Sequence, residues 1–92
     1  MTSDEVKSYV TEEMYEDASH EAFIGAETIE AAVENTVFWL TQDIIDLKYG
    51  EDWEDKCSSP EEEDEKFNAY TNEIKPAVQK YVIDRITASL QQ

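Results

Sequence analysis

Apolar residues recur along the first part of the chain at the spacing of an amphipathic helix. Four of them, each four positions after the last, predict one helix over residues 3–22. They are Val6, Val10, Met14 and Ala18. Thr2 and Glu5 have the spacing of a capping box at its start, and Gly25 is expected to end the segment.

The longest predicted helix covers residues 27–49 and is expected to end at Gly50. Its main apolar stripe has helical spacing and consists of Ile29, Ala32, Val33, Thr36, Val37, Leu40, Ile44 and Leu47. Phe38, Trp39 and Ile45 fall outside this stripe. A helix that is apolar on two sides needs two partners. One is the rest of the chain, and the other can be a second copy of it.

The segment "SPEE" is a strong helix start, with Ser59 as the cap, Pro60 at the first position and Glu62 in capping-box register. A short acidic helix is expected over residues 60–70. Because Pro76 disfavours a helical residue before it, a separate last helix is expected to begin there. Its apolar stripe is Val78, Tyr81, Val82, Ile86 and Leu90.

No segment alternates like a strand, and there is no internal repeat. The sequence therefore predicts a small all-α domain of about four helices with one long central helix. Ninety-two residues fit a single domain, here the whole range 1–92. With 40% apolar residues and only two Gly and two Pro, the composition is that of a folded chain rather than a disordered one.

The chain carries 23 acidic and 7 basic residues, a formal net charge of −16. This sign argues against direct binding to nucleic acid or to an anionic membrane. The longest apolar runs are too short to span a bilayer, and the polar N-terminus does not resemble a signal peptide. A single cysteine fits a reducing cytoplasm.

The charge is unevenly distributed. Residues 1–65 contain 21 acids and 3 bases, a net −18, whereas residues 66–92 contain 2 acids and 4 bases, a net +2. Several acids form like-charge pairs four positions apart, such as Glu13/Asp17 and Glu61/Glu65. On a helix such neighbours lie roughly 6 Å apart, close to the spacing of successive phosphates along a DNA strand.

The candidate functional residues are therefore carboxylates spaced like phosphates. They are Asp4, Glu5, Glu12, Glu13, Glu16, Asp17, Glu21, Glu27, Glu30, Glu34, Glu51, Asp52, Glu54, Asp55, Glu61, Glu62, Glu63, Asp64 and Glu65.

No residue pattern indicates catalysis, a cofactor or a metal centre. His20 is the only histidine, and carboxylates around Cys57 disfavour a nucleophilic thiolate. The acidic segment lacks the central glycine of a calcium loop, and Asp43 and Asp46 lack the histidine of a di-metal motif. Trp53 has two readings, an anchor of the acidic segment on the core or an exposed anchor for a partner.

The pattern resembles the phage antirestriction DNA mimics of the Ocr type. The likeness lies in an early acidic helix "YVTEEMYEDASHE", a long helix "ETIEAAVENTVFWLTQDIIDLKYG", an acidic connection and a late helix "NEIKPAVQKYVIDRITASL". The resemblance implies an all-helical homodimer that occupies the DNA groove of a type I restriction-modification enzyme in the bacterial host cytoplasm. The dimer contact is expected at Phe38, Trp39, Ile44, Ile45 and Leu47.

Three functions are consistent with these features. The leading one is a DNA mimic that inhibits a host DNA-binding defence enzyme without chemistry of its own and without a cofactor. The second is an acidic inhibitor of another bacterial nucleic-acid machine, an anti-CRISPR or an RNA polymerase inhibitor, with a localised surface around Trp53. The third is an acidic scaffold or chaperone-like module for a basic protein. An enzyme is not expected.

Overall fold

The computed structural model describes residues 1–91, and these form four helices with no strand. The helices are α1 (Ser3–Tyr9), α2 (Glu12–Gly25), α3 (Ile29–Tyr49) and α4 (Pro60–Leu90). The predicted all-α class and the long central helix are confirmed. Two of the predicted helix boundaries are wrong, as described below.

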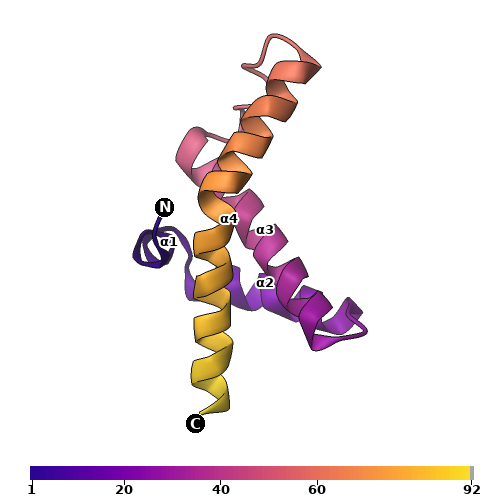
Figure 1. The fold of residues 1–92 in the computed structure, drawn as a ribbon, viewed down its shortest axis with the longest axis vertical. Coiled ribbons are helices and arrows are strands. Elements are labelled where there is room, and N and C mark those ends of the chain that lie inside the picture. The colour runs from indigo at the N-terminus through magenta and orange to yellow at the C-terminus, as the bar shows by residue number, and fades with distance from the viewer. Residues whose placement is uncertain (92) are drawn as a thin grey trace.

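The helices are arranged around α3, which lies between α2 and α4 and contacts both (Figure 1). The short α1 packs mainly on α4. α4 runs along the longest axis of a body measuring 48 × 28 × 20 Å, and its C-terminal end extends beyond the other helices. The elongated shape spreads the surface charge over a long molecule.

All four helices and the 50–59 connection contribute to one hydrophobic core. Its members are Val6, Val10, Ala18, Val37, Leu40, Ile44, Ile45, Trp53, Ile74, Ala77, Val78, Tyr81 and Val82. Nine of these thirteen residues belong to the three apolar stripes predicted from the sequence. Three stripe members, Ile29, Leu47 and Leu90, are exposed and lie outside the core.

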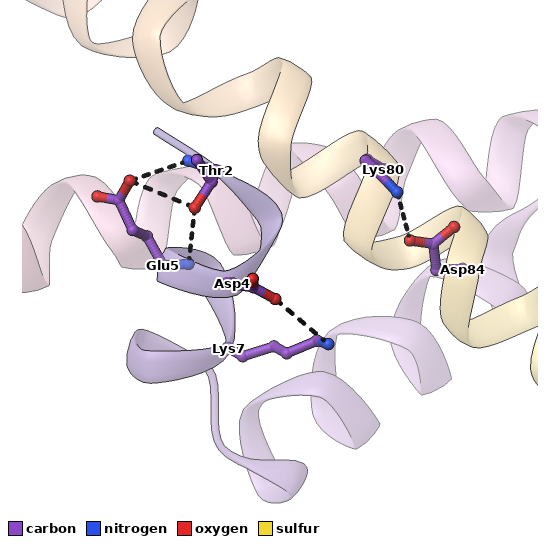
Figure 2. A network of polar contacts seen from close by, with 6 residues as sticks. All are labelled: Thr2, Asp4, Glu5, Lys7, Lys80 and Asp84. Atoms are coloured by element: carbon purple, nitrogen blue, oxygen red, sulfur yellow. Dashed lines mark hydrogen bonds and ion pairs between the residues drawn. The ribbon is translucent and has the colours of Figure 1, made fainter.

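Every helix begins at a hydroxyl cap, which satisfies an otherwise unpaired backbone N–H. Thr2, Thr11, Thr28 and Ser59 each accept a hydrogen bond from the amide three residues later. The predicted capping box of Thr2 and Glu5 is complete, as Figure 2 shows. At the other end of α3, Gly50 terminates the helix with a φ of 99°, a backbone conformation that favours glycine.

The predicted helix over residues 3–22 is in fact two helices. Val10 and Thr11 both have extended backbone, and the hydroxyl of Thr11 caps α2 through the amide of Met14 at 3.1 Å. The acids after Thr11 further favour a helix start there. The break turns α1 out of line with α2 and onto α4, and it leaves Val6 and Val10 buried in the core.

The predicted separation of the last two helices is also wrong, because α4 continues through Pro76 and includes Lys75. Pro76 itself is exposed. On either side of it, Ile74, Ala77 and Val78 are buried. Burial of these neighbours against the rest of the core offsets the missing backbone hydrogen bond and the steric cost of a proline within a helix.

Arg85 is the main polar link between α4 and the start of α2. Its guanidinium forms a bidentate ion pair with Glu12, in which the Nη2–Oε2 distance is 2.8 Å. The same group lies 4.0 Å from the ring centroid of Tyr15 and donates to the hydroxyl of Tyr81 at 3.2 Å. Tyr15 and Tyr81 meet edge to face, with ring centroids 6.0 Å apart. The ion pair and the aromatic contacts thus both hold α2 against α4.

Replacing Arg85 with lysine keeps the charge but removes the planar fork that pairs bidentately and covers Tyr15. We expect Arg85→Lys to lower the Tm by about 5 °C, measured by circular dichroism. Lys80→Ala is the matched control, because it removes only the exposed Lys80–Asp84 pair within α4 (Figure 2). That control is expected to cost no more than about 0.5 kcal/mol. Equal effects of the two variants would contradict this role of Arg85.

Candidate acidic interaction surface

The candidate carboxylates lie almost entirely on the outside of the molecule. Of the nineteen predicted residues, seventeen are exposed, and only Glu62 and Glu63 are half-buried. All four helices and the 50–59 connection contribute to the set. None of these nineteen side chains is buried in the core.

Few of these charges are neutralised by a basic neighbour. Four of the nineteen form ion pairs, namely Asp4 with Lys7, Glu12 with Arg85, Asp52 with Lys56 and Glu62 with Lys66. Figure 2 shows the first of them, at 3.7 Å. Within residues 1–91, the other fifteen carboxylates have no ion-pair partner. The surface therefore carries an electrostatic field that the protein's own cations do not cancel.

The like-charge pairs lie within helices, as their spacing predicted. Glu13/Asp17 and Asp17/Glu21 fall within α2, Glu30/Glu34 within α3 and Glu61/Glu65 within α4. Their members are therefore neighbours on a helix surface, and each such pair destabilises its helix by a few tenths of a kcal/mol.

The acidic 50–59 connection is fixed to the core by Trp53. This side chain is 5% exposed, and its ring meets that of Tyr70 edge to face with centroids 5.4 Å apart. Tyr70 also stacks on Tyr49 at 3.7 Å. Trp53 is therefore an anchor for its own segment, and the alternative that it is an exposed anchor for a partner is wrong. Its burial holds the surrounding carboxylates in place.

The ionisation of two carboxylates in this region is affected by their neighbours. The pKa of Glu54 is raised, first by the hydrogen bond to Glu63, then by burial and by the negative charges of Glu63, Asp46 and Asp55. Three segments therefore contribute acids to one place: α3, the connection and the first turns of α4. The pKa of Glu62 is lowered to about 2, chiefly by hydrogen bonds from the hydroxyl and amide of Ser58 and then by Lys66.

The expected dimer residues do not form one surface. Ile44 and Ile45 are buried in the chain's own core, so their inclusion was wrong. Phe38, Trp39 and Leu47 are each about half exposed. Phe38 and Leu47 are nine positions apart, which is two and a half turns and places them on opposite sides of α3. No single flat contact on this helix includes all five.

Asp43, a carboxylate outside the predicted set, lies in a groove between α2 and α3. Asp43 lies four positions after Trp39 on α3, and both line a groove with α2. Its pKa is raised, first by burial and second by the negative charge of Asp46. The spacing of four positions between Trp39 and Asp43 places them on the same face of a helix. That this face lines a groove follows only from the packing of α2 on α3.

The described residues contain no group of three or more histidine, cysteine or acidic side chains arranged to hold a metal ion. His20 is exposed on α2, and Cys57 is half-buried with its thiol directed to the carbonyl of Trp53 at 3.5 Å. Within the same residues, no helix combines the length and the apolar character needed to cross a bilayer.

No protein-family model matches the chain, and neither a curated protein nor a solved structure shows significant similarity to it.

The opposing pKa shifts predict a stability maximum in mildly acidic solution. Because the pKa of Glu54 is raised, its proton favours the folded state, and this stabilisation is lost as the pH rises through that pKa. The pKa of Glu62 is lowered, so its contribution is present above 4.5 and is lost as the pH falls toward about 2. We expect the Tm to rise from pH 7 to about 5 and to fall below about pH 4.

Glu54→Gln is expected to raise the Tm at pH 7 and to reduce the gain between pH 7 and 5. Glu51→Gln, in the same connection, is the matched control for the loss of one charge. Thermal melts of the three proteins across this pH range measure the effect. If both variants retain the full gain on acidification, protonation of Glu54 does not contribute to stability.

Proposed function

We propose that the protein is a DNA mimic that occupies the DNA-binding groove of a bacterial defence enzyme and thereby excludes DNA. The observation that carries this proposal is the set of fifteen exposed or half-exposed carboxylates without an ion-pair partner, held on a folded helical body. A DNA-binding groove presents lysine and arginine side chains to phosphates. The same cations can pair with carboxylates of this surface.

The linear charge density supports this reading. A net charge of −16 along a body 48 Å long corresponds to about one charge per 3 Å. One DNA strand carries a charge every ~3.4 Å, and the duplex carries one every ~1.7 Å. The protein thus matches the charge of a single strand of equal length and has a little over half that of a duplex. A partner that contacts phosphates mainly on one face meets a comparable field.

The fixed geometry of the carboxylates also supports this reading. All but Glu27 lie on helices or on a connection that Trp53 anchors, so binding does not require a flexible acidic segment to become ordered. Ordering a disordered chain lowers the affinity of a complex. A preorganised carboxylate array avoids this cost, and inhibition then needs no reaction and no cofactor.

Among targets, we propose a type I restriction-modification enzyme in the bacterial cytoplasm, because the sequence pattern resembles antirestriction mimics. The inhibitor of a polymerase or an anti-CRISPR centred on Trp53 has lost its main support, since that side chain is buried. An acidic module for another basic protein remains a competing outcome of the test below.

Inhibition by a mimic is expected to be distributed over many weak contacts. Glu13, Glu16, Glu61 and Glu65 are exposed and outside the ion pairs, so they report on binding without breaking the fold. Each single change to glutamine is expected to weaken inhibition by no more than about fivefold, and all four together by about thirtyfold or more. The measurement is displacement of labelled duplex from a purified type I enzyme.

Circular dichroism of each variant verifies that the fold is intact. Two results would contradict the proposal: loss of inhibition from one of the single changes, or an unchanged inhibition constant for the fourfold variant. Failure of the wild-type protein to displace DNA from such an enzyme would remove this target and favour the basic-protein alternative.

We also propose a homodimer, with Phe38 at the contact. Shallow grooves of about 340 and 230 Å³ on either side of Phe38 run between α3 and α4, and Glu34 is the only carboxylate among the residues that line them. Two chains of charge −16 meet with least repulsion at such a face. Phe38→Glu is expected to yield monomer in sedimentation, while Phe23→Glu, on α2, does not. A wild-type monomer at tens of micromolar would rule the dimer out.

A further inference from the structure

A groove of about 500 Å³ lies between α2 and α3. It is lined by Met14, Asp17, Ala18, Glu21, Trp39 and Asp43. The four residues from α2 have helical spacing and form one face of that helix, while Trp39 and Asp43 are four positions apart on α3. Two helix faces that pack against each other therefore create both the floor and the rim of this groove.

The floor and the rim differ in chemistry. Ala18 is 8% exposed and Met14 is half-buried, so the interior is apolar. Asp17, Glu21 and Asp43 are exposed carboxylates, and none of them forms an ion pair within residues 1–91. No basic residue lines the groove. An occupant that fits must combine positive charge with apolar surface.

Trp39 adds a flat aromatic surface to this groove. Its side chain is 53% exposed, and it is braced by Phe38, whose ring meets it edge to face with centroids 5.3 Å apart. An exposed indole beside carboxylates is a favourable place for a cation, because the ring face attracts positive charge while the carboxylates pair with it. The chain's own cations lie elsewhere, so this aromatic surface has no cation within residues 1–91.

The electrostatic surroundings of Asp43 favour the binding of a cation in the groove. Partial burial and the charge of Asp46 raise its pKa, so its ionised form is less well stabilised than that of a freely solvated carboxylate. A cation in the groove would stabilise that ionised form. Among biological cations, a guanidinium is planar, weakly hydrated, able to stack on an indole and able to pair with a carboxylate bidentately. An ammonium group has none of these four properties.

We propose that the α2–α3 groove binds an arginine side chain of the protein's partner, with the guanidinium against the indole of Trp39 and paired with Asp43, Asp17 or Glu21. That the arginine belongs to a DNA-binding groove rests on the proposed function. The preference for arginine rests on the groove alone. A second copy of the chain is a poorer occupant, because its own acidic surface would face three carboxylates.

The two tryptophans allow a direct test by NMR of the indole N–H groups. Trp39 is half exposed at the groove, whereas Trp53 is 5% exposed in the core and serves as an internal reference. The probes are a peptide of three arginines with blocked termini and its three-lysine counterpart. The arginine peptide is expected to shift the Trp39 signal, to leave the Trp53 signal in place, and to bind about fivefold more tightly than the lysine peptide.

Variants separate the groove from general charge attraction. Asp43→Asn and Asp64→Asn each remove one negative charge, but Asp64 lies on α4 outside the groove. Asp43→Asn is expected to weaken binding of the arginine peptide several-fold more than Asp64→Asn. Trp39→Leu keeps an apolar side chain and is expected to abolish the preference for arginine over lysine. The unchanged Trp53 signal verifies that each variant is folded.

Equal affinities for the two peptides, or equal effects of Asp43→Asn and Asp64→Asn, would overturn the proposal. In the Phe38→Glu variant, a Trp39 signal that still moves with protein concentration alone would also overturn it, in favour of a second copy. The arginine preference can hold while the protein fails to displace DNA, and then only the proposed function is wrong. Displacement of DNA without an arginine preference refutes the groove alone.

Discussion

Repulsion among carboxylates is the constraint on which the arrangement of this protein depends. A net charge of −16 on 92 residues opposes compaction, and the core available to offset it is small. The fold places acids where the backbone favours them. Each helix has acidic residues in its first turn, behind a threonine or serine cap. There the positive end of the helix dipole and the unpaired amides interact favourably with negative charge.

Two of the seven basic residues link one helix to another. Arg85 joins α4 to α2, and Lys48 joins α3 to α4 through Glu73, whose pKa is lowered first by Lys48 and then by Tyr49. The other ion pairs are formed within a helix or within the 50–59 connection, and all but the half-buried Lys66–Glu62 pair are exposed. These two ion pairs reinforce the packing of α4 on α2 and on α3, while most of the surface is left negative. A cationic partner can relieve this repulsion, and this possibility links the stability of the fold to its proposed function.

Helical periodicity predicted the fold class and most of the core, because apolar stripes such as Leu40 and Ile44 reflect burial directly. It did not predict where helices stop. At Thr11, one hydrogen-bonded cap overrode a continuous apolar stripe. At Pro76, burial of Ile74, Ala77 and Val78 overrode a residue that usually ends helices. Whether a helix ends at such a residue depends on its contacts with distant segments. The periodicity of one segment carries no information about those contacts.

The same limit applies to the candidate surface. The exposure of the carboxylates could be predicted, since charged residues off an apolar stripe face solvent. The burial of Trp53 and Ile45, and the groove that gives Trp39 and Asp43 a common role, could not. Each depends on which helix packs on which face. Local spacing identified the chemistry of the surface, whereas tertiary packing determined which aromatic residues are available to a partner.

The most direct test of this account is thermal unfolding as a function of ionic strength. Between about 0.01 and 1 M NaCl the Debye length falls from about 30 to about 3 Å, which screens repulsion between exposed carboxylates. If uncompensated carboxylates are the main electrostatic contribution to the folded state, the Tm rises steadily over this range. A Tm that falls with added salt would mean that ion pairs dominate the surface and would contradict the account.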